Sequence, residues 1–240
     1  SEQKIESTKK FLTKLWNVSR FLSSFPIVES VEYTEFTDHW IIAELDKLVN
    51  DCKVGFDEYN FFIPATAIRE WTWNVFAAQY IEMVKARAYG IGFSDTERDS
   101  AIYTLHKVLS TLLKFMAPIT PFITDFLWRT LYSDKSIHTE QLDLEWKIEG
   151  VVIGGIGVDY DDPEFKPEKS DGLQPYLNTG IAQAIADHFG EISESVIDFN
   201  STVWNAKKEK GLSLKDSIKI EIPKELEIFK KDLVAMHNLG

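Results

Sequence analysis

The sequence predicts a mainly α-helical protein, in which a bundle of helices is followed by a small α+β domain. Apolar residues recur at three- and four-residue spacing through most of residues 4–132, which is the pattern of amphipathic helices. Short segments with Gly, Pro, Asn or Asp separate these runs, and helices joined by short loops form bundles. Near the C-terminal end one segment alternates as a β-strand does. We therefore expect a helical bundle before a mixed C-terminal unit.

Two amphipathic helices are expected first. Residues 4–24 form one helix, and Pro26 ends it. Its apolar positions are Ile5, Phe11, Leu12, Leu15, Trp16 and Leu22. The second helix is expected to start at Thr37 or Asp38, because both side chains suit an N-cap. Its apolar face consists of Ile41, Ile42, Leu45, Leu48 and Val49.

Three further helices complete the expected bundle. Residues 61–89 predict a long helix with an irregularity near Pro64, ended by the glycines that follow it. Residues 96–115 predict a fourth helix. Thr120 is expected to cap a fifth, with Pro121 at its first position.

The C-terminal elements are expected to be both helical and extended. A helix is predicted from residue 177 to 210, with an interruption near Gly190 and an end at Gly211. Residues 215–222 alternate in the manner of a strand, and Pro223 starts a last helix.

These elements predict three parts of the chain. Residues 1–147 form the helical domain. Residues 148–176 form a linker or insertion that is partly strand. Residues 177–240 form the small α+β domain.

The charge pattern bears on the choice of partner. The formal net charge is −12, whereas a non-specific nucleic-acid binder usually has a basic excess. The first twenty residues are an exception, since they hold five cations against Glu2 and Glu6. The cations are Lys4, Lys9, Lys10, Lys14 and Arg20. A local basic face on an acidic molecule is therefore consistent with the sequence.

Several classes of function are not supported. Cys52 is the single cysteine and the five histidines are isolated, so we expect no disulfide and no metal site. No run of about 18 apolar residues predicts a membrane span, and the N-terminal residues lack the apolar core of a signal peptide. These features favour the cytoplasm. No catalytic motif is recognisable, so we expect no catalytic or cofactor-binding residue in this chain.

Aromatic residues crowd the long third helix. Trp71 and Trp73 lie about 200° apart on a helix, so one of them is expected to be less buried. An exposed Trp73 offers a ring on which the bases of single-stranded RNA stack. A core helix with a charged outer face is the alternative interpretation.

The sequence contains motifs that resemble those of a known family. Residues 14–21 (KLWNVSRF) resemble the opening helix motif of the anticodon-binding domain that valyl-, isoleucyl- and leucyl-tRNA synthetases share. Further similar motifs occur in order at residues 38–41, 59–61, 71–87, 117–128 and 136–138, with Asp125 where a glutamate is usual. Residues 199–214 and 235–237 resemble the tail of archaeal-type valyl enzymes.

The resemblance implies a module of a class I synthetase that joins valine to its tRNA. It implies two partners, tRNA and the catalytic domain of the same polypeptide, and a parent enzyme that uses ATP with magnesium. The family's His-x-Gly-His and Lys-Met-Ser-Lys-Ser signatures are missing from this sequence, so the chain is not expected to be catalytic. Two alternatives stay open: an isoleucyl or leucyl enzyme, and a helical protein-interaction scaffold without RNA binding.

The candidate tRNA-binding residues fall into three groups. Asn17 and Arg20 lie one turn apart on the first helix, where an amide and a planar guanidinium can bond a base. The third helix contributes Trp73, Lys85 and Arg87. The third group consists of Lys207, Lys208 and Lys210, which occupy a motif of the family's C-terminal domain. The alternative roles are a helix–helix salt bridge for Arg20, a side-chain hydrogen bond for Asn17 and dipole capping for the lysines.

Overall fold

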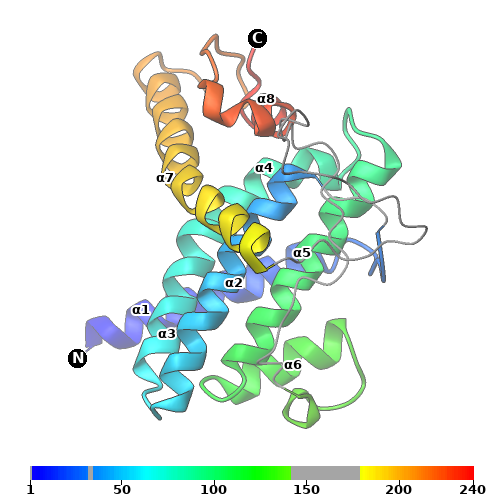
Figure 1. Ribbon diagram of the computed structural model, residues 1–240, viewed down its shortest axis with the longest axis vertical. Coiled ribbons are helices and arrows are strands. Elements are labelled where there is room, and N and C mark those ends of the chain that lie inside the picture. The colour runs from blue at the N-terminus through cyan, green and yellow to red at the C-terminus, as the bar shows by residue number, and fades with distance from the viewer. Residues whose placement is uncertain (1, 32–34, 142–178) are drawn as a thin grey trace.

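The computed structural model describes residues 2–31, 35–141 and 179–240, and it is mainly helical as predicted (Figure 1). The elements are α1 (Glu2–Leu22), α2 (Phe36–Asp57), α3 (Phe62–Trp71), the π-helix η1 (Thr72–Tyr80), α4 (Ile81–Ala88), α5 (Asp95–Met116), α6 (Pro121–Leu131), the 3-10 helix η2 (Ile137–Thr139), α7 (Thr179–Glu209), the 3-10 helix η3 (Lys224–Phe229) and α8 (Lys230–His237).

Helices α1 to α6 form the expected bundle. Helix α2 packs along α3 and α5, and α5 also packs against α4 and α6. Their apolar faces meet in one core, in which Leu15 of α1, Leu45 of α2 and Leu109 of α5 are fully buried. The same core continues through Val196 of α7 and Leu233 of α8. Burial of these faces, more than helix propensity, holds the helices in place.

The helix starts follow local capping chemistry. Ser94 caps α5, where Glu97 N–H donates to Ser94 Oγ at 3.3 Å and Ser94 N–H donates to Glu97 Oε2 at 2.7 Å. Helix α6 has Pro121 at its first position, as predicted. Helix α2 starts at Phe36, near the predicted position, but its N-cap is Glu35 and not Thr37 or Asp38. The Glu35 N–H donates to Asp38 Oδ2 at 3.3 Å. Asp38 therefore closes the first turn from inside the helix.

The long third helix is confirmed, but its irregularity lies elsewhere. Elements α3, η1 and α4 follow one another from Phe62 to Ala88, and the irregular part is the π-helix η1. Pro64 lies in the first turn of α3, where a backbone N–H has no helical acceptor, so its ring disturbs nothing. Gly90 and Gly92 follow the helix with φ of 68° and 80°, a left-handed conformation that glycine adopts without strain.

Helix α7 is continuous. The interruption expected near Gly190 does not occur, and the helix ends just before Gly211, whose φ is 65°. The expected glycine terminator of this helix is thus confirmed.

The strand expected at residues 215–222 does not form. Among the described residues, β pairing is limited to one isolated parallel bridge between Ile218 and Leu239. Ile218 N–H donates to Asn238 O, and Gly240 N–H donates to Ile218 O, both at 3.2 Å. No described strand lies beside this segment to extend the ladder, so the structure does not show the β part of the expected α+β unit.

The C-terminal helices pack directly on the bundle. Helix α7 lies against α2 and η1, and α8 lies against α4 (Figure 1). The linker predicted at residues 148–176 lies outside the described residues, so the predicted domain boundaries stay predictions.

A buried ionic network joins the C-terminal end of the chain to the bundle. The two Nη atoms of Arg87 donate to the Asp38 carboxylate at 2.7 and 2.8 Å, and Nε donates to Asp232 Oδ1 at 3.1 Å. Tyr80 Oη donates to Asp38 Oδ1 at 2.6 Å, and Ser100 Oγ donates to Asp38 Oδ2. All five residues are buried. The network therefore ties η1, α2, α4, α5 and α8 together.

The two carboxylates in this network differ in environment. Burial favours the neutral form of Asp38, but the adjacent Arg87 guanidinium and two hydroxyl donors outweigh burial, so the pKa of Asp38 is lowered. For Asp232, burial outweighs the attraction of Arg87, and the pKa is raised. A single guanidinium thus compensates two buried acids, and its loss would leave both without a counterion.

A second set of buried hydrogen bonds also joins the C-terminal helices α7 and α8 to the bundle. Asn200 of α7 donates through Nδ2 to Gln79 Oε1 of η1 at 2.8 Å. The Oδ1 atom of Asn200 is an acceptor and lies 2.7 Å from His237 Nε2, so the imidazole donates here. Burial, with the nearby Lys207 charge, lowers the pKa of His237 to about 4, so this imidazole is neutral at pH 7.

We predict that Arg87→Met destabilises the protein strongly. Methionine fills the space of the alkyl stem but leaves Asp38 and Asp232 buried without a cation, which costs about 3–5 kcal/mol of unfolding free energy. Urea unfolding followed by circular dichroism measures this. Arg98→Met is the matched control, because Arg98 pairs with Asp95 and Asp99 at the surface and its loss should change little. Equal midpoints for the two variants would show that the network does not hold the fold together.

Candidate nucleic-acid interface

The outer face of α1 is cationic. Its buried side consists of Phe11, Leu15, Val18 and Leu22. On the other side Lys9, Lys10 and Arg20 are exposed and Lys14 is half-buried, against the exposed Glu6. Within the described part of the chain, none of these four cations forms a salt bridge. On a protein with a net charge of −12, this helix is a local positive surface.

Asn17 and Arg20 lie on this cationic face. Both are exposed, and their three-residue spacing on a helix places the two side chains next to each other. The alternative role for Arg20, a salt bridge between helices, finds no partner among the described acids. Contact with a base through these two side chains stays a prediction.

Trp73 lies beside α1 and is accessible. Trp71 is 9% exposed and Trp73 is 40% exposed, which confirms that the two rings point to different sides. The Lys14 Nζ atom lies 5.3 Å from the centroid of the Trp73 ring, a cation–π contact. Trp73 belongs to η1, the wide-turn segment that packs against α1. The cationic face of α1 therefore continues onto an exposed indole.

Lys85 extends this surface only weakly. Its Nζ donates to both carboxylate oxygens of Glu82, at 2.7 and 2.8 Å, and lies 5.8 Å from the centroid of the Phe21 ring. Lys85 is half-buried, and Glu82 offsets its charge. The positive charge of the cationic face of α1 therefore decreases from Trp73 toward the end of the third helix.

Arg87 is not part of this surface. It is 0% exposed, and three of its nitrogens donate to Asp38 and Asp232 within the core. A guanidinium that is enclosed and committed in this way cannot reach a tRNA phosphate while the protein is folded. The candidate role of Arg87 in tRNA binding is therefore corrected to a structural one.

The lysine cluster at the end of α7 contains one buried member and two exposed ones. Lys207 is 1% exposed, and its Nζ donates to Leu214 O and His237 O, both at 2.7 Å. It therefore joins the end of α7 to the segment after Gly211 and to the end of α8, and it is not available to phosphate. Lys208 and Lys210 are exposed and stay candidates.

Trp16 is a candidate that the sequence analysis did not select. It was expected among the apolar positions of α1, yet it is 43% exposed and stacks on Phe126 of α6 with a centroid distance of 5.6 Å and an interplanar angle of 20°. Phe126 is itself 54% exposed. Trp16 lies 100° from Leu15 around the helix, at the edge of the buried stripe, and this spacing was the available signal.

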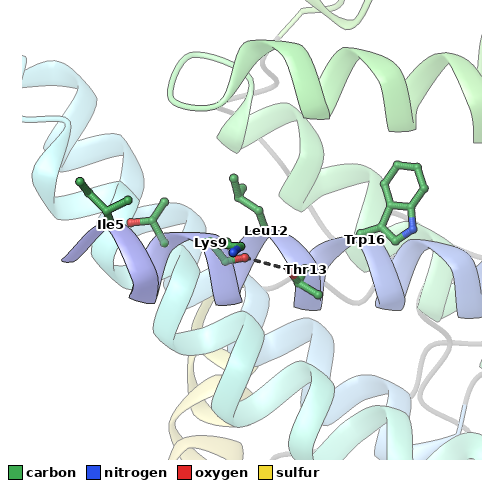
Figure 2. A pocket seen from close by; sticks show the side chains of 6 residues that line it. Ile5, Lys9, Leu12, Thr13 and Trp16 are labelled. Carbon is green, nitrogen blue, oxygen red and sulfur yellow. Dashed lines mark hydrogen bonds between the residues drawn. The ribbon is translucent and has the colours of Figure 1, made fainter. Parts of the chain in front are cut away.

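An open groove of about 670 Å³ runs along α1 beside this ring pair. It is lined by Ile5, Thr8, Lys9, Leu12, Thr13 and Trp16. Figure 2 shows Ile5, Leu12 and Trp16 rising from the same side of the helix. The groove is therefore mostly apolar, with Lys9 at its edge.

Other kinds of site find no support in the described residues. They contain no group of three or more His, Cys, Asp or Glu side chains that could hold a metal ion. None of the described helices is both long enough and apolar enough to span a membrane.

Comparison with known proteins gives one family. The model for the anticodon-binding domain of tRNA ligase matches residues 38–222. The chain is 31% identical to a valine–tRNA ligase of Aeropyrum pernix, with 98% of this chain and 25% of the relative covered. It is 32% identical to the valine–tRNA ligases of Nanoarchaeum equitans and Pyrobaculum aerophilum, with 100% of this chain and 26% of each relative covered. The chain thus spans about a quarter of the length of these relatives.

We predict opposite outcomes for the neighbouring lysines of α7. Lys207→Met should lower the free energy of unfolding by about 2–3 kcal/mol, because the buried carbonyl of His237 and the partly buried carbonyl of Leu214 lose a charged donor. Lys208→Met should leave stability nearly unchanged, since that side chain is in solvent. Thermal and urea unfolding of the two variants measure the difference. Indistinguishable unfolding curves would contradict the role given to Lys207.

Proposed function

The chain belongs to the family of anticodon-binding domains of tRNA ligases, and on that premise we propose that it binds the anticodon arm of a valine tRNA for a valine–tRNA ligase. Valine is proposed because the relatives that match over nearly all of this chain are valine–tRNA ligases. An isoleucyl or leucyl enzyme would use the same binding surface with another tRNA.

The exposed face formed by α1 and η1 is the observation that carries this proposal. It places the exposed Asn17 and Arg20 on the same helix as Lys14, whose ammonium contacts the exposed Trp73 ring, on an otherwise acidic molecule. Sequence-specific proteins read single-stranded RNA loops by stacking bases on aromatic rings and by bonding their edges through polar side chains. A protein-interaction scaffold would not require this combination of cations and accessible rings.

Each side chain has a distinct part in the proposed contact. Lys9, Lys10 and Lys14 neutralise backbone phosphates, which gives affinity without discrimination. The Arg20 fork and the Asn17 amide bond the edge of an unpaired base, which gives discrimination. Trp73 stacks on a base while the ammonium of Lys14 holds the ring in place.

Lys208 and Lys210 are proposed to contact phosphate elsewhere on the tRNA. They lie at the end of α7 that Figure 1 places at the opposite end of the molecule from the N-terminus of α1. A phosphate backbone that reaches both surfaces must therefore run along the side of the bundle.

The chemistry of aminoacylation is proposed to take place outside this chain. The catalytic part of the parent polypeptide would bind ATP with magnesium and join valine to the tRNA, in the cytoplasm. The contribution of these 240 residues is to present the correct tRNA to that part.

We predict that Arg20→Ala reduces discrimination and leaves the fold intact. The side chain is exposed, so stability should change little, whereas preference for the cognate base should fall by about 1–3 kcal/mol. Binding of valine tRNA and of anticodon-altered versions, with thermal unfolding alongside, measures both effects.

Lys10→Ala is the matched comparison, because Lys10 is exposed and a phosphate contact should weaken binding to every tRNA by the same factor. If Arg20→Ala also weakens all tRNAs equally, Arg20 is a phosphate contact. If the unaltered chain binds no tRNA at all, the proposed function is wrong.

A further inference from the structure

The groove along α1 has the chemistry of a base-binding subsite. Its end wall is the indole of Trp16, which Phe126 supports from behind in a stacked arrangement at 5.6 Å. Phe122 lies one turn before Phe126 on α6 and is 90% exposed, so a further ring stands near this pair. Three exposed rings from two helices thus form an apolar surface. Packing of α1 against α6 alone would not require all three rings to be exposed.

We infer that this groove binds one unpaired base of the RNA loop, stacked on Trp16. This inference rests on the proposed function, since it assigns a second stacking position to the proposed tRNA-binding helix α1, on the side that carries Arg20 and not on the side where Lys14 contacts Trp73. It differs from the contact at Trp73, which lies on η1 beside Lys14.

Charge favours a nucleotide as the occupant. Arg20 follows Trp16 by four residues on α1, so its guanidinium lies on the same side of the helix, and Lys9 lines the groove (Figure 2). The apolar surface has Lys9 beside its middle and Arg20 one turn beyond Trp16, so cations are close to the phosphates of a nucleotide whose base stacks on the indole. Apolar protein segments would gain from the wall but not from the cations.

The position of the groove agrees with this occupant. Asn17 and Arg20 follow Trp16 directly on the same helix, so the groove is continuous with the residues proposed to read the loop. Stacking tolerates any base, so Trp16 supplies affinity while Arg20 supplies discrimination.

The experiment combines protein variants with altered RNA. The full chain and its Trp16→Ala, Trp16→Phe and Ile228→Ala variants are titrated with the anticodon stem-loop of valine tRNA. Each loop nucleotide is then replaced in turn by an abasic one. Ile228 is the control, because it is 41% exposed on η3, away from the groove.

We expect Trp16→Ala to weaken binding about 5- to 100-fold, while Trp16→Phe keeps most of the affinity and Ile228→Ala keeps all of it. One abasic position should weaken binding to the unaltered chain but not to Trp16→Ala, since both changes remove the same stack. Trp16→Phe keeps a ring against Phe126, so it tests stacking even if the alanine variant is unstable.

Two failures are distinguishable. If the unaltered chain does not bind the stem-loop, the proposed function fails and this inference fails with it. If the chain binds and Arg20→Ala weakens it, but the Trp16 variants bind as tightly as the unaltered chain, then the groove is not a base site. That second result would favour a protein segment as the occupant of the groove. It would overturn this inference but not the proposed function.

Discussion

One arginine side chain compensates two buried carboxylates, and the relative placement of the bundle and the C-terminal helices depends on it. Arg87 lies at the end of the long third helix, Asp38 in the first turn of α2 and Asp232 in α8. Asp38 and Asp232 are 194 positions apart, yet they share the same guanidinium. Since an uncompensated charge in this interior would cost several kcal/mol, these three elements have to come together for any of them to be satisfied.

This network lies away from the surface that we propose binds tRNA, but it fixes the elements that build that surface. The third helix contains Tyr80, which donates to Asp38, and Gln79, which accepts from Asn200 of α7. Both residues belong to η1, the segment that also presents Trp73. The buried face of this π-helix is therefore held by two polar contacts, while its outer face offers an indole to solvent. Rigid positioning of an exposed ring favours stacking, because less conformational entropy is lost on binding.

Local features of the fold could be predicted from the sequence. The helices, the Pro121 start of α6 and the opposite orientation of Trp71 and Trp73 follow from periodicity and capping within a few residues. The roles of Arg87 and Lys207 could not, because each depends on acceptors that tertiary folding brings close. A cation near the end of a helix looks the same in sequence whether it faces solvent or a buried carboxylate. The strand expected at residues 215–222 failed for a related reason, since alternation does not provide a neighbouring strand.

The candidate site was predictable in part. Asn17, Arg20 and Trp73 are exposed, as residues that bind tRNA must be. The family motif directed attention to Asn17 and Arg20, and the angle between Trp71 and Trp73 on a helix directed attention to Trp73. Trp16 was missed because an aromatic residue at helical spacing is usually assigned to the core, whereas here the buried stripe of α1 is narrow and leaves the indole at its edge. Contact with RNA depends on a second molecule. Sequence and fold therefore predict which side chains are exposed to make the contact, and not which nucleotide each of them binds.

Ultraviolet crosslinking of the full chain to the anticodon arm of valine tRNA tests the central claim most directly, with the crosslinked peptides identified by mass spectrometry. We expect crosslinks from loop nucleotides to peptides that contain residues 9–20 of α1 and Trp73 of η1. Loop crosslinks confined to η3 and α8, with none on α1, would contradict it.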